Sequence, residues 1–183
     1  MKIQQTAIDG VVVVETTPFH DSRGVFMRLF CERELSTVLG TRRIVQVNYS
    51  RTDAVGAIRG LHYQQPPHAE MKLVRCLQGR VWDVAVDLRQ DSPTFLRWHA
   101  EELTPDHARM LVIPEGCAHG FQVLELESEL LYLHTTFYEP TAEGGFCVDD
   151  PRLKISWPLP ITDLSPRDQA LPCLSADFAG IAL

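Results

Sequence analysis

The sequences IPEGCAHGFQ, residues 113–122, and RGLHYQ, residues 59–64, decide which fold this chain adopts. Each places one histidine, His119 or His62, beside glycine in an otherwise apolar segment typical of a β-strand. Further strands are predicted over residues 11–14, 44–49, 95–100, 110–113, 120–124 and 130–137, with a hairpin over residues 71–77 and 81–88. Many short strands separated by glycine and proline predict a mainly β fold, a sandwich or jelly roll, rather than alternating strands and helices.

Helices and linkers contribute little to this pattern. One helix is predicted over residues 31–39, where Gly40 ends it. Proline is frequent from Asp149 onward, which predicts a tail that lies over the barrel as extended chain with a short helical turn. Because no repeat, low-complexity segment or charge run marks a linker, we expect one domain over residues 1–183.

The composition argues against several classes of protein. A formal net charge of −7 disfavours nucleic-acid binding, which needs a basic face, although a local cluster of Arg and Lys can still hold a small anion. No apolar run approaches the ~20 residues of a membrane span, and residues 1–10 lack a signal-peptide pattern. The five cysteines are scattered and never spaced CxxC, which argues against a disulfide framework or a zinc knuckle and indicates a reducing cytoplasm.

Both histidine segments partly match the metal-binding pattern of small β-barrels of the cupin type. That pattern has an HxH pair followed by a glutamate, and later a PxG-x2-H segment. Here PEG precedes His119 with the right gap, but Gln64 replaces the histidine two residues after His62, and Glu70 lies at the wrong distance. Since a tight divalent site needs three or four ligands, no metal is predicted. Two histidines without a complete metal shell favour acid–base chemistry on an organic substrate.

Taken singly, the candidate residues have ordinary structural explanations. An isolated histidine is more often a satisfied structural residue than a catalytic one, and a barrel tyrosine such as Tyr132 usually packs its ring. Arg23, beside Gly24, is by itself a solvated turn arginine, and Asp168 in SPRD is by itself the beginning of a helix. The functional hypothesis depends on the segments taken together.

In combination, the ordered segments resemble the dTDP-4-dehydrorhamnose 3,5-epimerase family, the deoxysugar epimerases of nucleotide-sugar pathways. The segments are FHDSRGVF (19–26), QVNYS (46–50), RGLHYQ (59–64), KLVRCLQGRVWDVAVDLR (72–89), DSPTF (91–95), IPEGCAHGF (113–121), LYLHTTFY (131–138), DDPRLKISWP (149–158) and SPRD (165–168). The resemblance implies a metal-free cupin jelly roll that needs no cofactor and acts on a nucleoside-diphosphate 4-keto-6-deoxy sugar. It also implies a homodimer with exchanged N-terminal strands.

The resemblance implies a role for each catalytic candidate. Carbons 3 and 5 of such a sugar lie alpha to the C4 carbonyl, so inversion needs a base, a proton donor on the opposite face and a polar or positive group at the carbonyl oxygen. By resemblance, His62 is the base, and Asp168 is the carboxylate that orients it and raises its pKa. Tyr132 is the proton donor, and Lys72 stabilises the developing enolate oxygen.

Other residues match the family's substrate contacts. His119, held by Asp83, is expected to add a second polar group near the carbonyl oxygen, and guanidinium groups suit a diphosphate. The predicted contacts are Arg59 and Arg23 for sugar and phosphate, Gln46, Asn48 and Glu143 for other parts of the substrate, Phe26 and Tyr138 for stacking on the base, and Arg167, which stands where a lysine is frequent.

Departures from the family pattern leave the exact substrate open. Arg28 stands where the family often has glutamate, and residues 48–59 are one residue longer than in some relatives. The leading hypothesis is a 3,5-epimerase that converts dTDP-4-dehydro-6-deoxy-D-glucose to dTDP-4-dehydro-L-rhamnose. The alternatives are an epimerase of C3 only or C5 only, a ketoisomerase of similar fold, a metal-dependent cupin enzyme and a sugar-binding cupin without turnover.

Overall fold

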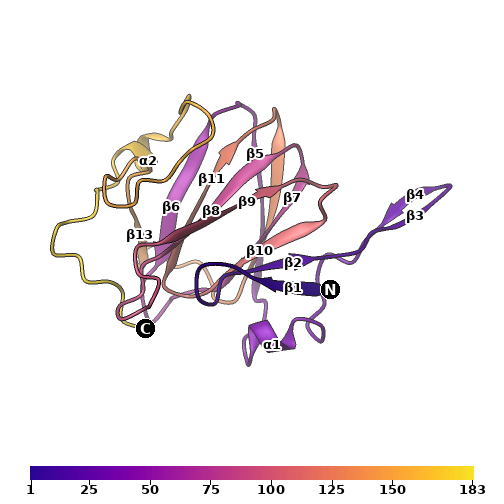
Figure 1. Ribbon diagram of the computed structural model, residues 1–183, viewed down its shortest axis with the longest axis horizontal. Coiled ribbons are helices and arrows are strands. Elements are labelled where there is room, and N and C mark those ends of the chain that lie inside the picture. The colour runs from indigo at the N-terminus through magenta and orange to yellow at the C-terminus, as the bar shows by residue number, and fades with distance from the viewer.

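The chain forms two antiparallel sheets that face one another, in a computed structural model that describes residues 1–183 (Figure 1). The larger sheet has six strands in the order β1 (Lys2–Gln5), β2 (Val12–Glu15), β10 (Arg109–Ile113), β7 (Lys72–Gln78), β12 (Ser128–His134) and β5 (Gln46–Thr52). The smaller sheet has five strands in the order β13 (Glu143–Gly145), β6 (Ile58–Gln64), β11 (Cys117–Val123), β8 (Val81–Asp87) and β9 (Trp98–Leu103). This architecture confirms the predicted mainly β jelly roll.

The predicted hairpin over residues 71–77 and 81–88 is wrong in its pairing. Both strands form, as β7 and β8, but β7 pairs with β10 and β12 whereas β8 pairs with β9 and β11. The turn at Gly79, where φ is +74°, therefore crosses from one sheet to the other. A tight turn between two apolar strands is compatible with either arrangement, so the local sequence did not identify the pairing partner.

A hydrophobic core fills part of the space between the sheets. Side chains alternate along a strand, so every second residue points inward. Val74 and Cys76 of β7 belong to one buried cluster with Ala85 of β8 and Phe121 of β11. Lys72, two residues before Val74, continues this inward face and lines a cavity instead of the apolar core. The polar pocket therefore begins where the core ends.

Segments outside the two sheets cover their outer faces. Leu39, from the segment that precedes β5, packs in a cluster with Leu73 of the larger sheet. Leu174, from the C-terminal tail, packs in a cluster with Leu61 of the smaller sheet, and Figure 1 shows this tail beside β6 and β13. The expected extended tail with one helical turn is confirmed, the turn being α2 (Pro166–Gln169).

The predicted helix over residues 31–39 is shorter than expected. Only α1 (Ser36–Leu39) is helical, and Gly40, at φ +60°, follows it. Leu35 precedes the helix without a side-chain cap, and the first turn has no acidic residue, so its first amide groups lack the usual stabilisation. Neither α1 nor α2 has the length and apolar content to cross a membrane.

A small hairpin projects away from the two sheets. It consists of β3 (Phe19–Asp21) and β4 (Gly24–Phe26), which pair with each other alone, and every residue of both strands is exposed. Figure 1 shows this hairpin reaching outward from the end of the larger sheet. Phe19 and Phe26 keep 75% and 78% of their surface exposed, which is unusual for side chains of this size.

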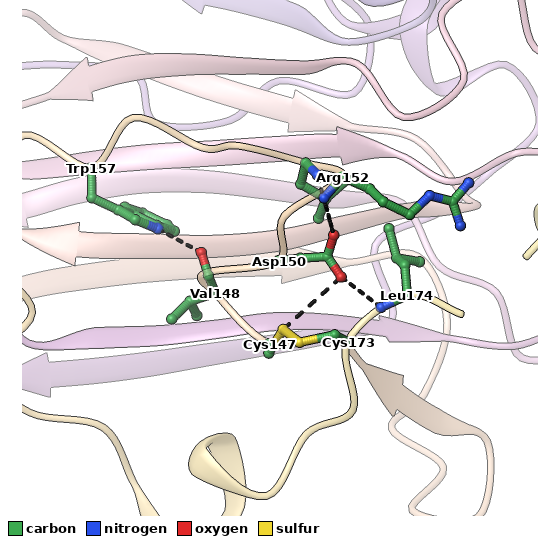
Figure 2. The surroundings of a disulfide bond; sticks show 8 residues. Cys147, Val148, Asp150, Arg152, Trp157, Cys173 and Leu174 are labelled. Carbon is green, nitrogen blue, oxygen red and sulfur yellow. Dashed lines mark hydrogen bonds between the residues drawn. A yellow bond between two sulfur atoms is a disulfide. The ribbon is translucent and has the colours of Figure 1, made fainter. Parts of the chain in front are cut away.

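A disulfide ties the tail to the smaller sheet, contrary to the expectation from the scattered cysteines. Cys147, two residues after β13, is bonded to Cys173, and its amide donates to the carbonyl of Pro172 (3.0 Å). Buried Asp150 accepts from the amide of Leu174 (2.5 Å), as Figure 2 shows. Twenty-six residues separate the two cysteines, so their pairing depends on the fold and has no spacing signature. Because disulfides are rare in a reducing cytoplasm, the cysteine pattern gives weaker support for that compartment than expected.

Candidate active site

A cavity of about 350 Å³ lies between the sheets, beside α2. Polar side chains from both sheets and from the tail line it. Among the sequence-predicted site residues, the cavity brings together Asn48, Arg59, His62, Lys72, His119, Tyr132, Tyr138, Glu143, Arg167 and Asp168. Two further predicted residues, Gln46 and Asp83, are hydrogen-bonded to members of this set.

Close approach of β6 and β11 sets the two motif histidines side by side. Gly60 has φ +129°, and a Cβ atom there would lie 2.6 Å from the Cα of Gly120. Only glycine permits this backbone contact and this dihedral angle together. In the resulting register His119 is directly opposite His62, and both rings line the cavity. The glycines of RGLHYQ and IPEGCAHGFQ therefore have a structural function that positions the histidines.

His62 is held by a carboxylate from the tail. Its Nε2 lies 2.7 Å from Oδ1 of Asp168, which is buried. Asp168 is fixed in turn, because its Oδ2 accepts from the amide of Gly60 (3.3 Å) and its own amide donates to Oγ of Ser165 (3.0 Å). A carboxylate only accepts hydrogen bonds, so neutral His62 carries its proton on Nε2 and leaves the lone pair of Nδ1 free to act as a base.

The pKa of His62 is lowered, contrary to the increase expected from its carboxylate partner. Burial disfavours the charged imidazolium and is the largest effect, while the hydrogen bond and the charge of Asp168 act in the opposite direction. The positive charges of Lys72 and Arg167 lower the pKa further. The carboxylate alone would raise the pKa of His62, but the cost of burying a cation is larger. His62 is consequently neutral, the form needed in a base, at neutral pH.

Tyr132 approaches the cavity from the opposite sheet. Its ring lies edge-on to His119, with ring centres 5.9 Å apart, and its hydroxyl accepts a long hydrogen bond from Oγ of Ser50 (3.4 Å). Burial raises the pKa of Tyr132, so the phenol stays protonated. A phenol on β12 and an imidazole on β6 thus face one cavity from two sides.

Polar groups that can stabilise negative charge line the same cavity. The Nζ of Lys72 donates to the carbonyl oxygen of His62 (3.2 Å) and lies 3.2 Å from Oε1 of Glu70. On the other sheet, Nε2 of His119 lies 2.7 Å from Oδ1 of Asp83, which is the expected partner. The ammonium group and the imidazole therefore both come from side chains with fixed orientations.

A second cluster of polar side chains lies at the mouth of the cavity. Arg167 forms an ion pair with Glu143, and Oε2 of Glu143 accepts from the hydroxyl of Tyr138 (2.6 Å). Gln46 accepts from the amide of Tyr138 (3.0 Å) and donates to Oδ1 of Asn48 (3.2 Å). These residues come from β5, β13, α2 and the segment after β12, and together they form a polar rim.

The guanidinium groups expected to bind phosphate have different locations. Arg59 lines the cavity and donates to Oγ1 of Thr52 (2.8 Å). Arg23 and Phe26 lie on the exposed β3–β4 hairpin and do not line this cavity. Arg28, the departure noted in the sequence, forms an ion pair with Glu34. The chain's own fold therefore does not bring the hairpin residues into the site.

Gln64, which replaces a metal ligand of related barrels, has a structural function. It is buried, its amide nitrogen donates to the carbonyls of His68 (3.0 Å) and Phe137 (3.3 Å), and its oxygen accepts from the amide of Glu139 (2.6 Å). With all three of these bonds made to backbone, the side chain joins two loops and does not line the cavity. Its position does not match that of a metal ligand beside His62.

Glu70 and His134 line the cavity but were not predicted as site residues. In the sequence, Glu70 stands out only as a possible metal ligand at the wrong distance from His62. His134 falls two residues after Tyr132 on the same strand, and this alternation is a signal that could have identified it. The pairing between Glu70 and His134, at 2.7 Å, has no sequence signature because 64 residues separate them.

Two facing sheets that present an imidazole, a phenol and an ammonium to one polar cavity have the architecture of an enzyme of the cupin class. The chain belongs to the dTDP-4-dehydrorhamnose 3,5-epimerase family, whose sequence model matches residues 5–176. Membership places this enzyme among the isomerases.

Individual relatives resemble the chain over nearly its whole length. The dTDP-4-dehydrorhamnose 3,5-epimerase of Shigella flexneri is 42% identical over 169 residues, which cover 92% of this chain and 93% of that protein. The dTDP-6-deoxy-D-glucose-3,5-epimerase of Legionella pneumophila Philadelphia 1, solved with dTDP-4-keto-L-rhamnose, has a TM-score of 0.91 at 39% identity and covers 98% and 97% of the two chains. A 3′-monoepimerase of Streptomyces bikiniensis, solved with dTDP-quinovose, has a TM-score of 0.85 at 31% identity and covers 92% and 85%.

Proposed function

We propose that this protein is a cofactor-independent epimerase of a nucleoside-diphosphate 4-keto-6-deoxy sugar, with dTDP-4-dehydro-6-deoxy-D-glucose as substrate and dTDP-4-dehydro-L-rhamnose as product. One observation carries the proposal: the base candidate His62 and the acid candidate Tyr132 line one cavity from opposite sheets. Inversion of a carbon needs proton removal from one face and proton delivery to the other. The names of the Shigella and Legionella relatives support the choice of substrate.

The proposed reaction begins at a carbon next to the C4 ketone. Nδ1 of His62 takes the proton, and the C–H electron pair moves through the new double bond to the C4 oxygen. The ammonium of Lys72 stabilises the enolate, where a positive charge in a partly dehydrated pocket is most effective. Tyr132 then gives its proton to the carbon from the other face, and the electron pair returns to restore the ketone. Exchange with solvent removes the proton from His62 and returns one to Tyr132.

The polar rim, together with Arg59 on β6, is the proposed binding site for the remainder of the substrate. Arg59 and Arg167 supply positive charge, and a guanidinium binds diphosphate oxygens with two parallel hydrogen bonds. Tyr138, which is 48% exposed, offers an aromatic face for the nucleobase. The Legionella relative was solved with a dTDP-linked sugar, which supports a ligand of this class.

We further propose that the enzyme works as a homodimer in which N-terminal strands are exchanged. Three observations support this. Arg23 and Phe26 are predicted substrate contacts but lie on a hairpin outside their own chain's cavity. The hairpin exposes the apolar side chains of Phe19 and Phe26, and the edge strand β5 exposes Val47 and Tyr49, each by 58%. Exposed apolar groups of this size are typical of an interface, and a second copy of the chain supplies a complementary one.

Proton NMR of the product tests the proposed function. Incubation with dTDP-4-dehydro-6-deoxy-D-glucose is expected to give the L-rhamno product, with both C3 and C5 inverted. Inversion at one carbon alone would make the protein a monoepimerase, a possibility raised by the name of the Streptomyces relative. Unchanged substrate with dTDP-, UDP- and GDP-linked sugars would exclude the proposal.

A further inference from the structure

A second histidine–carboxylate pair lies beside Lys72 in the same cavity. Nδ1 of His134 lies 2.7 Å from Oε2 of Glu70, and Oε1 of Glu70 lies 3.2 Å from Nζ of Lys72. The side chains of Lys72, Glu70 and His134 are only 10%, 8% and 9% exposed. Burying three titratable groups is costly unless each is paired. The pairing of these three side chains therefore allows all of them to lie inside the pocket.

We propose that Glu70 and His134 are positioning residues that orient Lys72 toward the substrate's carbonyl oxygen. The inference rests on the proposed function, because that function assigns Lys72 to this oxygen. An ammonium group has three hydrogens. One is donated to the carbonyl of His62 (3.2 Å) and one is directed at Glu70, which leaves the third for a ligand in the cavity.

The directions of the hydrogen bonds indicate which ring nitrogen of His134 carries the hydrogen. The amide N–H of Tyr138 donates to Oε1 of Gln46 (3.0 Å), which identifies the other amide atom of Gln46 as the nitrogen. That nitrogen donates to Oδ1 of Asn48 (3.2 Å), so the Nδ2 of Asn48 is the atom 3.3 Å from Nε2 of His134. Since Asn48 donates there, Nε2 of His134 carries a lone pair, and its hydrogen resides on Nδ1 facing Glu70.

The same network keeps Glu70 ionised. Burial alone raises the pKa of a carboxyl, but the hydrogen bond from His134 and the charge of Lys72 outweigh it, so the pKa of Glu70 is lowered. Glu70 thus accepts from His134 on one oxygen and pairs with Lys72 through the other. The hydrogen bond from His134 engages part of the negative charge of the Glu70 carboxylate. Glu70 therefore holds the ammonium of Lys72 in place without neutralising it completely. A continuous chain of bonds also joins Lys72 to Asn48 and Gln46, residues of the proposed binding rim.

A double-mutant cycle tests whether Glu70 acts through Lys72. Glu70→Gln keeps the size of the side chain and removes its charge. We expect it to lower kcat about tenfold or more while KM changes less than about threefold, because the enolate forms only after binding. In a Lys72→Ala background the same substitution is expected to have almost no further effect. An equal loss in both backgrounds would overturn the proposal, because a merely structural residue loses the same amount with or without Lys72.

A spectroscopic measurement tests the inference independently of turnover. In protein labelled with ¹⁵N-histidine, long-range ¹H–¹⁵N correlation is expected to show His134 neutral with its proton on Nδ1 at pH 7, assigned by loss of its signals in His134→Gln. A proton on Nε2, or an imidazolium, would overturn the proposal whether or not a sugar is turned over. If wild-type enzyme were inactive on every sugar while His134 had the expected tautomer, the proposed function would fail and the described network would stand.

Discussion

His62 on β6 and Tyr132 on β12 lie in different sheets of the jelly roll and line the same cavity. Under the proposed mechanism, this relationship assigns proton removal and proton delivery to two different side chains. Removing one residue should therefore affect a different step from removing the other, and the steps can be measured separately as proton exchange and inversion.

Tyr132→Phe tests the assignment of the proton donor. The variant keeps His62, Lys72 and the aromatic ring, so exchange of the substrate's alpha proton with solvent should continue. Completed inversion should fall by about a hundredfold or more, because the general acid is missing. Deuterium incorporation and product formation are followed together by NMR, with His62→Ala as the control that should abolish both. Full inversion in Tyr132→Phe would mean that another group delivers the proton.

The pH dependence of kcat/KM tests the surroundings of His62. The base acts as the neutral imidazole, so activity rises as pH increases through its pKa. Since burial holds that pKa below the ordinary value of ~6.5, half-maximal activity on the acid side should occur below pH ~6.5.

Removing the carboxylate partner of His62 should shift the acid limb, the low-pH side of the kcat/KM profile, in a defined direction. Asp168 raises the pKa of His62 against the effect of burial, so Asp168→Asn should shift the limb to still lower pH. The plateau value of kcat/KM should also fall by about a hundredfold or more, because the imidazolium that forms on His62 during the reaction loses its partner. A shift toward higher pH would contradict the balance of burial and carboxylate described for this site.

The position of the β3–β4 hairpin predicts complementation between two impaired variants. Arg23→Ala should weaken substrate binding, and His62→Ala should remove the base. If the hairpin serves the partner's cavity, a mixed dimer of the two variants contains one intact site. Coexpression in equal amounts should then restore about a quarter of wild-type activity, because about half the dimers are mixed and each has one working site of two. No recovery in mixtures whose subunits are shown to exchange would mean that the hairpin does not complete the neighbouring site.

The disulfide predicts a reductant-sensitive stability. Cys147 and Cys173 close a loop of 26 residues, for which loss of the cross-link costs about 3 kcal/mol. For a chain of this size the midpoint of thermal unfolding should fall by about 6 to 12 °C on reduction or in Cys147→Ser. Cys31→Ser, at a free and half-buried cysteine, is the matched control and should show no such fall. Equal midpoints with and without reductant would show that the bond is not formed in solution.

Much of the fold could be predicted from local sequence. Apolar segments predicted most of the strands, and the family resemblance brought His62 and Asp168 into one site although they are 106 residues apart. The pairing of β7 and β8 was mispredicted because a tight turn does not specify whether the next strand stays in the same sheet. The positions that require glycine, Gly60 and Gly120, depend on contact between two strands and became apparent only in the structure.

Features that depend on the three-dimensional surroundings of a residue could not be predicted from the sequence. The pKa of His62 depends on burial as well as on Asp168, and burial was not visible in the motif. The Cys147–Cys173 bond and the Glu70–His134 pair likewise join residues from distant segments without a spacing rule. Family patterns identified residues in recurrent motifs and did not reveal these pairings.

Deuterium incorporation is the most direct test of the central claim that His62 and Tyr132 invert carbons next to a ketone. Wild-type enzyme is incubated with dTDP-4-dehydro-6-deoxy-D-glucose in deuterated water, and C3 and C5 are followed by proton NMR. The account predicts that the proton signals at both carbons disappear as the L-rhamno product forms, and that His62→Ala leaves them unchanged. Inversion with retention of the original protons, or unaltered exchange in His62→Ala, would contradict it.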